Sequence, residues 1–326
     1  MSAGRALTMT ILINNYNYAA FLARSIESAF NQTWPSVQII VVDDGSTDAS
    51  AEIASRYSAP NYLVLLKQNG GQNSAIAHAL KHVNGDYTII LDSDDWLLPH
   101  ACETVMKAAA RSAPNAVMYR LAKTDNQGRI LGFFPNEPVQ TTELRSFVST
   151  HGYMPSPPTS GNAYRTGFLK EAMQFVSPST PFCDGYLAWA AGWTEAVEAL
   201  PAVLGCYGVH GSNISTTGGF DRSRLYKSSN VALDHARHLH AWLEARRHSP
   251  LSWHDLINAY VWRDILYLKL VEHAYPELSW TLCRRHGSAK FWRARHHGVW
   301  KRIKNILFLI AGSQFGEFRD RMRGRP

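Results

Sequence analysis

The sequence predicts an α/β protein with a mostly parallel sheet flanked by helices and a helical C-terminal extension. Three observations predict it. In the first 115 residues, apolar strand-like runs alternate with segments of helical spacing, which is the pattern of a doubly wound sheet. Two of these runs end directly in Asp clusters, and ligands bind at the carboxyl ends of strands in such sheets. From about residue 221 onward the pattern is almost wholly helical.

The first part of the chain is expected to contain four strands and four helices. The strands are apolar runs, typical of strands covered on both faces, and the helices space apolar residues three and four apart. Ser46, Thr47 and Asp48 supply helix-start chemistry before the second helix. The expected strands are 7–13, 37–42, 62–66 and 87–91, and the expected helices are 21–30, 49–57, 74–83 and 100–110.

The pattern becomes irregular after residue 116. Residues 125–128 predict a turn between short strands, and residues 151–161, rich in Pro, Ser and Gly, predict a loop. A helix is expected over 184–200 and a short strand over 203–209.

Composition excludes several classes of protein. With 326 residues and 45% apolar residues, the chain is long enough and apolar enough to fold around a sizeable core. The four cysteines are far apart and form no CxxC pair, which favours reduced, mostly buried thiols over disulfides or a zinc site. The start of the chain has no secretory signal, and no apolar stretch reaches the roughly 18 residues that span a bilayer, so we expect a cytoplasmic protein.

The net charge of +7 comes largely from the C-terminal tail, 290–326, which contains ten Lys and Arg residues and only two acidic residues, Glu317 and Asp320. Residues 301–310 combine basic side chains with Ile and Leu at helical spacing. Such a helix can lie in an anionic membrane interface, here the inner membrane face, or it can pack on the protein and leave a solvated tail. Both interpretations stay open. No recognisable reader motif accompanies the basic residues, so nucleic acid is not an expected partner.

The acidic run Asp92, Ser93, Asp94 and Asp95 follows the apolar strand 87–91. Carboxylates at i and i+2 converge when the chain leaves the extended conformation, and hard oxygen ligands suit Mg²⁺ or Mn²⁺ together with phosphate oxygens. The alternative is a solvated loop in which Asp95 caps the next helix.

Polar residues also follow the first two strands. Asp43 and Asp44 can accept hydrogen bonds from a base or a ribose, and Gly45 permits a tight turn there. Tyr16 can stack on a nucleobase whose edge meets the amides of Asn14 and Asn17, although turn chemistry with a packed Tyr explains the same residues.

Together these motifs resemble the N-terminal half of a family 2 glycosyltransferase with the GT-A fold. The resemblance covers roughly residues 7–215, and the joint match is specific although each piece alone is weak. Its segments are Asn14 to Asn17, Asn31 to Pro35, Val41 to Asp48, Asn69 to Ser74 and Leu91 to Pro99.

The resemblance implies an inverting enzyme that uses a nucleotide-diphosphate sugar and a divalent metal, Mn²⁺ or Mg²⁺. It implies a GT-A domain over 1–220, with the nucleotide-sugar site in 1–115 and the acceptor and catalytic part in 116–220, followed by a helical region over 221–326. The implied donor-binding residues are Asn14, Tyr16, Asn17, Asp43, Asp44, Gly70, Gly71, Asp92 and Ser93, with Asp43 serving either the ribose or the fold.

Two later segments extend the resemblance. Asp184 matches the catalytic base, although Cys183 replaces the acid that often precedes it; capping of a helix is the alternative. His210 matches a late His near the metal and diphosphate, so the implied metal ligands are Asp94, Asp92 and His210. A packing role for His210 is the alternative.

The chain also departs from the family pattern. Asn14 stands where Pro is common, and the Arg often found after the Asn69 segment is missing, so Lys67, His78, His210 or the metal must balance the diphosphate. We expect a UDP-sugar donor and a hydroxyl acceptor on a glycan, a lipid-linked glycan or a small molecule. Two other functions stay open: a phosphohydrolase with an aspartate nucleophile in the Asp43 segment, and a non-catalytic nucleotide-sugar binder.

Overall fold

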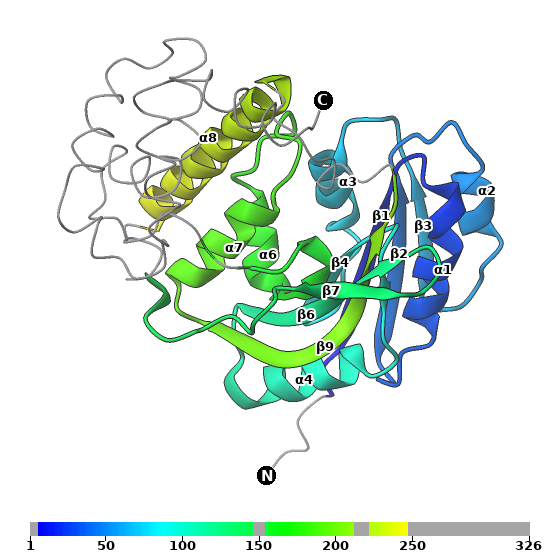
Figure 1. Cartoon of the computed structure of the whole chain (residues 1–326), viewed down its shortest axis with the longest axis horizontal. Coiled ribbons are helices and arrows are strands. Elements are labelled where there is room, and N and C mark those ends of the chain that lie inside the picture. The colour runs from blue at the N-terminus through cyan, green and yellow to red at the C-terminus, as the bar shows by residue number, and fades with distance from the viewer. Residues whose placement is uncertain (1–5, 146–153, 155, 212–221, 247–326) are drawn as a thin grey trace, which may run out of the picture. The chain divides into compact units, whose positions relative to one another are not determined.

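A computed structural model describes residues 6–145, 154, 156–211 and 222–246 of the chain (Figure 1). The chain divides into two compact units, one formed by Met1–Leu144 and Pro155–Asn213, the other by Arg145–Met154 and Ile214–Pro326. The first unit holds the sheet. The described part of the second unit contains one long helix, α8 (Arg222–Ala245), which has Leu239 and Trp242 among its buried side chains.

The N-terminal half of the sheet is parallel, as predicted. β1 lies between β2 and β4 and pairs in parallel with both, and β3 continues the parallel order beyond β2. The strands are β1 (Met9–Asn15), β2 (Val37–Asp43), β3 (Tyr62–Leu66) and β4 (Tyr87–Asp92). The helices between and after them are α1 (Ala19–Phe30), α2 (Ser50–Ser55), α3 (Gln72–Ala79) and α4 (Ala101–Ser112).

Beyond β4 the sheet is mixed. In the described residues it has nine strands in the order β3-β2-β1-β4-β8-β6-β9-β5, with β7 paired to β6. β6 and β9 are parallel, while β8, β7 and β5 join their neighbours antiparallel. The strands are β5 (Trp96–Leu97), β6 (Ala116–Asp125), β7 (Ile130–Phe134), β8 (Asn162–Arg165) and β9 (Val197–Val209), and the helices are η1 (Thr159–Gly161), α6 (Thr166–Met173) and α7 (Asp184–Trp193). The turn predicted over 125–128 joins β6 to β7 and is confirmed.

The hydrophobic core explains why these segments fold as they do. Alternate residues of β1 and β4, such as Ile11 and Ile89, are fully buried and pack in one cluster with Leu22 and Ile26 of α1 and with residues of α4. Residues at i and i+4 share one face of a helix, so Leu22 and Ile26 form the apolar stripe that the sequence spacing predicts. This core fixes the ends of β1, β2 and β4 relative to one another.

The helix expected over 184–200 is too long. α7 ends at Trp193, Glu195 adopts a left-handed φ of 57°, and β9 already begins at Val197, six residues before the predicted strand. Pro201 lies inside β9, where the pairing with β6 shifts register. Such an irregularity accommodates a residue that lacks an N–H donor.

The predicted start of the second helix is right in part. Asp48 accepts the Ser50 N–H at 3.0 Å, but its other oxygen accepts Ala19 N–H at the start of α1. Ala49 occupies the N-cap position of α2, and the Ser46 hydroxyl donates a hydrogen bond to Asp43 instead of capping this helix.

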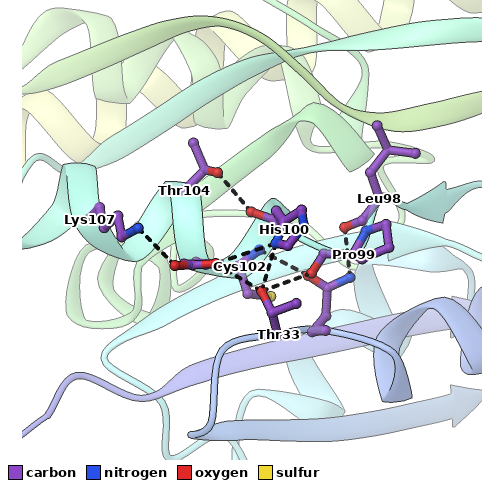
Figure 2. A network of polar contacts seen from close by, with 9 residues as sticks. Thr33, Leu98, Pro99, His100, Cys102, Thr104 and Lys107 are labelled. Carbon is purple, nitrogen blue, oxygen red and sulfur yellow. Dashed lines mark hydrogen bonds and ion pairs between the residues drawn. The ribbon is translucent and has the colours of Figure 1, made fainter.

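A polar network ties the segment after α1 to the start of α4 (Figure 2). Thr33 Oγ1 contacts His100 Nδ1 at 3.2 Å, and the side chain of Gln32 donates to Leu98 O at 3.0 Å and accepts the Cys102 N–H at 2.9 Å. The first N–H groups of a helix have no partner within it, so Gln32 supplies one. The network therefore holds the chain that follows the acidic run.

Three predictions concern thiols, membranes and the tail. Cys102, Cys183 and Cys206 are free and buried, as predicted, while Cys283 lies outside the described residues. In the described ranges, no helix combines the length and the apolar character that crossing a membrane requires. The basic tail, 290–326, also lies outside the described residues, so its membrane binding stays a prediction.

Candidate active site

Polar side chains gather where β1, β2 and β4 end, at one edge of the sheet. Asn14 of β1 lies opposite Asp92 of β4, and Asn15 lies opposite Asp43 of β2. Successive side chains of a strand point to opposite faces, so the pairs Asn14–Asp92 and Asn15–Asp43 occupy different faces of the sheet.

On the face of the sheet that holds Asn15 and Asp43, the polar side chains bond to one another and to the adjoining turns. Asp43 is 3% exposed, and its carboxylate accepts hydrogen bonds from Asn15 Nδ2 at 2.7 Å, Ser46 Oγ at 2.6 Å and Ser46 N at 3.0 Å. Asn17, at φ 57°, accepts the Thr47 N–H at 2.7 Å. These contacts occupy both oxygens of Asp43 and join the turns that follow β1 and β2.

Asp44 holds the loop that leads to α3. Its carboxylate, which is 3% exposed as a residue, pairs with Lys67 and accepts the backbone N–H groups of Gly70 at 3.0 Å and Gly71 at 2.7 Å. Gly71 has a φ of 86°, which side-chain-bearing residues rarely adopt, and this lets the loop turn into α3. Lys67 therefore balances the charge of Asp44 in this structure.

Asp92 is clamped by two amides. Asn14 Nδ2 and Gln72 Nε2 both donate to its Oδ1 at 2.9 Å, and Gln72 Nε2 lies 3.2 Å from Asn14 Oδ1. Gln72 directly follows Gly71, whose N–H binds Asp44. The two acidic strand ends, Asp44 and Asp92, thus meet the same first turn of α3.

His210 contacts Asp94 directly, with Nε2 3.0 Å from Oδ2 and only 3% of the imidazole exposed. The imidazole stacks on Phe21 at a centroid distance of 4.3 Å and meets the edge of Tyr18 at 5.8 Å. The aromatic side of α1 therefore fixes the position of His210 beside the acidic turn.

Asp95 anchors the acidic turn to β9. It is 1% exposed, and its Oδ1 accepts the Gly208 N–H at 2.9 Å. A Cβ at Gly208 would lie 2.3 Å from the backbone oxygen of Asp94, so only glycine fits there. Asp95 does not act as the helix cap considered from the sequence, because its carboxylate binds β9 instead.

Asp184 begins α7 and is half-buried. No hydrogen bond between described residues holds its carboxylate, so capping of α7 does not account for it. The charge of Asp184 contributes to raising the pKa of Asp92, so Asp184 belongs to the same acidic site as Asp92.

The electrostatics of this site favour a cation. Burial first, and then the neighbouring Asp94 and Asp184 charges, raise the pKa of Asp92 to about 7, while the Asn14 and Gln72 amides oppose that rise. Burial and the charges of Asp94 and Asp92 also raise the pKa of Tyr18 to about 12. Clustered carboxylates of this kind fit a hard divalent ion. However, the described residues contain no preformed group of three His, Cys, Asp or Glu side chains around one point, so the trio of Asp92, Asp94 and His210 stays a prediction.

The structure brings most of the predicted residues to this edge. Asn14 contacts Asp92, His210 contacts Asp94, Gly70 and Gly71 contact Asp44, and Ser93 is buried within the acidic turn. Tyr16 is 46% exposed, as suits an open stacking surface. His78 does not join the acidic contacts reported above; its ring lies 6.0 Å from that of His82 beyond the end of α3.

Sequence reasoning missed Gln72, Tyr18, Phe21 and Gly208 as site residues. Tyr18, at the N-cap of α1, and Phe21, within its first turn, stand three residues apart, which was a detectable signal of neighbouring side chains. A cavity of about 500 Å³ lies away from the site, at the first residues of β4, where Asp86, Arg165 and Lys170 line it. The acidic edge, with its clustered charges, is the better candidate for chemistry.

The parallel strand ends, the acidic turn and the mixed second half of the sheet define a GT-A-type glycosyltransferase fold. Among solved structures, the chain resembles residues 1–349 of TarS from S. aureus in complex with UDP-GlcNAc, with a TM-score of 0.57 and 15% identity over 98% of this chain and 93% of that one. It also resembles the mannosyltransferase PcManGT from Pyrobaculum calidifontis in complex with GDP-Man and Mn²⁺, with a TM-score of 0.50 and 14% identity over 93% and 87% of the two chains.

Residues 10–162, somewhat less than half of the chain, match the family model for glycosyl transferase family 2. One relative is an uncharacterised glycosyltransferase from Nostoc, 29% identical over 217 residues, which are 64% of this chain and 66% of that protein. The chain spans smaller shares, 14% and 36%, of two further relatives.

Proposed function

We propose that the protein is an inverting, metal-dependent glycosyltransferase that moves a sugar from a nucleoside-diphosphate sugar to a hydroxyl group. One observation carries the proposal: the first turn of α3 contacts both acidic strand ends, through Gly71 at Asp44 and Gln72 at Asp92. A nucleotide and its diphosphate lying across this turn would meet both carboxylates at once. The family match and the GT-A fold support the same activity.

The donor in this proposal is a UDP-sugar. TarS, a structural relative, is known in complex with UDP-GlcNAc, although its 15% identity supports the fold rather than the choice of sugar. Tyr16, with an exposed ring at the end of β1, offers a face on which the base would stack. The Asp44 loop, with Gly70 and Gly71, would line the nucleotide side, where glycine permits close approach of the backbone.

Asp92 and Asp94 would hold Mn²⁺ or Mg²⁺, and His210 would act either as a further ligand or through its contact with Asp94. Their oxygen atoms and excess negative charge fit such an ion, and PcManGT is a structural relative with Mn²⁺ in its complex. The bound ion would neutralise negative charge on the diphosphate leaving group. Ser93, buried between the two carboxylates, would fix the turn that presents them.

Asp184 would act as the general base. Its carboxylate would accept the proton of the acceptor hydroxyl while that oxygen bonds to the anomeric carbon and the bond from this carbon to the diphosphate breaks. Attack from the side opposite the leaving group inverts the anomeric configuration. The lack of a hydrogen bond to Asp184 within the described residues leaves this carboxylate available for the proton, and its interaction with Asp92 supports a location near the diphosphate.

The test compares the wild-type protein with Asp184→Asn, using UDP release from a panel of UDP-sugars and acceptors in the presence of Mn²⁺. We expect Asp184→Asn to keep donor binding and to lose at least about 100-fold in transfer rate, as general-base removal typically costs. NMR of the product should show inverted anomeric configuration. Retained configuration, or transfer that survives the substitution unchanged, would refute this mechanism.

The two other functions make different predictions. A phosphohydrolase would use Asp43 or Asp44 as nucleophile, but Asp43 is enclosed by Asn15 and Ser46, and Asp44 is held by Lys67 and two backbone N–H groups. Phosphatase turnover without a nucleotide sugar would favour it nevertheless. A non-catalytic binder would bind UDP-sugar and show no transfer with any acceptor.

The acceptor is proposed to be a hydroxyl of a glycan, a lipid-linked glycan or a small molecule. The basic tail, 290–326, would bring the protein to an anionic membrane surface on its cytoplasmic side, which would suit a lipid-linked acceptor. Sedimentation with anionic vesicles, comparing the full chain with a chain ending at Ala289, tests the tail directly.

A further inference from the structure

We propose that Gln72 is a positioning residue which, together with Asn14, locks the orientation of Asp92 before substrate binds. This inference rests on the proposed function of the site. It concerns residues on two different elements, the end of β1 and the first turn of α3, that converge on one carboxylate oxygen.

The three side chains form a closed ring of hydrogen bonds. Asn14 Nδ2 and Gln72 Nε2 each donate to Asp92 Oδ1 at 2.9 Å, and Gln72 Nε2 also lies 3.2 Å from Asn14 Oδ1. A side-chain amide nitrogen carries two N–H donors, so Gln72 can make both bonds at once. Reversing either amide would place oxygen against oxygen, so the ring also fixes the orientation of both amides.

The ring determines which oxygen of Asp92 is available. Oδ1 receives both amides, and Oδ2 has no hydrogen bond among the described residues. Asp94 and Asp184, whose negative charges contribute to raising the pKa of Asp92, would push this carboxylate away if it were free to rotate. The ring opposes that rotation. Partners of this kind around a ligating carboxylate typically set its orientation and affinity.

Neutral amides suit this role better than a cation would. A Lys or Arg on the turn would neutralise Asp92 and compete with a bound metal, whereas an amide fixes the carboxylate and leaves its charge in place. No Lys or Arg occurs between Gln68 and Leu80, so the first turn of α3 brings only neutral or weakly basic side chains to the site.

The same turn is tied down on both sides. Gly71 N–H binds Asp44 at 2.7 Å on one side, and Asn73 Nδ2 donates to the backbone oxygen of Thr180 at 2.6 Å on the other. Asn73 and Thr180 are both buried, and Thr180 lies four residues before Asp184. The first turn of α3, which holds Gln72, therefore also contacts the segment that leads to Asp184, the proposed base.

The experiment measures Mn²⁺ and UDP binding to the full chain by calorimetry, first Mn²⁺ alone and then UDP in saturating Mn²⁺. Gln72→Met keeps the length of the side chain and removes both N–H donors. Asn14→Ala removes the other hydrogen bond to Asp92 Oδ1, the one that comes from β1. Gln127→Met makes the same chemical change in the exposed β6–β7 turn and is the matched control. We expect about tenfold weaker Mn²⁺ binding for Gln72→Met, a similar loss for Asn14→Ala, and none for the control.

The double variant separates positioning from independent contacts. Asn14 and Gln72 bond to the same oxygen and to each other. The fold-loss in Mn²⁺ affinity of the double variant should therefore be smaller than the product of the two single losses, whereas the losses of two unconnected residues would multiply. In transfer assays, Gln72→Met should lower kcat more than it raises KM for the acceptor. Its unfolding temperature in EDTA should stay within a few degrees of wild type.

Wild-type Mn²⁺ affinity in Gln72→Met, or losses that multiply in the double variant, would overturn the inference. If Gln72→Met fails to fold, Asn14→Ala decides, because an unchanged affinity there is equally incompatible with the ring. If the wild-type protein itself binds neither Mn²⁺ nor UDP, the proposed function fails, and the role of Gln72 falls with it. The two failures are therefore distinguishable by the wild-type measurement alone.

Discussion

Replacing Gly208 by Ala tests how the acidic turn is held against β9. The added Cβ would lie 2.3 Å from Asp94 O, which belongs to backbone that cannot rotate away, so β9 must move outward. That movement stretches the 2.9 Å bond from Gly208 N–H to the buried carboxylate of Asp95. Overpacking typically costs about 1–3 kcal/mol, and an unsatisfied buried acceptor costs about as much again.

We therefore expect Gly208→Ala to lower the free energy of unfolding by about 2–5 kcal/mol, which lowers the unfolding temperature by roughly 5–15 °C in a domain of this size. It should also displace His210, two residues further along, and weaken Mn²⁺-dependent UDP binding. Thermal unfolding followed by circular dichroism measures the first effect. Gly167→Ala is the matched control: it lies in α6 with nothing within 4 Å of the new Cβ and should be neutral or slightly stabilising. An unchanged unfolding temperature for Gly208→Ala would refute the packing described here.

Three further predictions follow from the fold and the site. In the folded protein Asp92 has a pKa of about 7, above the value of 3.8 for an ordinary Asp, so the metal-free protein should lose stability as pH rises from 4 to 7. In EDTA, the unfolding temperature should fall less steeply with pH for Asp92→Asn than for the wild type. Equal slopes for the two proteins would contradict this prediction. Gln32→Leu should lower the free energy of unfolding by about 1–3 kcal/mol in urea titration, because Cys102 N–H loses its side-chain acceptor and Leu98 O keeps only the Ala101 N–H. A change below about 0.5 kcal/mol would contradict this prediction. Burial raises the pKa of the Cys102 and Cys183 thiols, so iodoacetamide at pH 8 should modify them in urea but not in the native protein, as peptide mapping would reveal.

The parallel half of the fold was predictable from the sequence because its signals are local and strong. Residues 37–42 and 87–91 are largely apolar runs, interrupted only by Gln38 and Thr88, and Asp follows each directly. Each run became a largely buried strand with the acidic residue at its carboxyl end. The first helix showed its buried face through Leu22 and Ile26. Hydrophobic burial determines all of these segments, and it leaves a regular spacing in the sequence.

The mixed half was less predictable because its strands depend on distant partners. β8 spans only Asn162–Arg165 between a Pro-rich segment and α6, so no periodicity could reveal it. β9 carries Pro201, which normally argues against a strand, and the register shift against β6 that accommodates this residue exists only in the folded sheet. The alternation of Ala, Val, Glu and Leu before Pro201 suits a helix equally well, and this produced the error over 194–200.

The candidate site shows the same division. Asp44, Asp92, Asp94 and His210 were predictable because charged residues at strand ends stand out. Gln72 was not, because an amide at the start of a helix has no distinctive pattern, and its partner Asp92 lies 20 residues away. The proximity of Asp184 to Asp92 depends on the packing of α7, which the sequence does not encode locally.

The alternation at the end of β1 has a consequence for engineering. Asn14 and Asn15 are chemically identical neighbours, yet Asn14 contacts Asp92 in the candidate site and Asn15 contacts Asp43 on the opposite face, because successive side chains of a strand alternate in direction. Deleting a single residue upstream in β1 would move Asn15 into the position opposite Asp92 and Asn14 into the buried position of Ile13, and Tyr16 would then stand opposite Asp43. Variants of the candidate site should therefore keep the number of residues in β1 unchanged and substitute Asn14 itself.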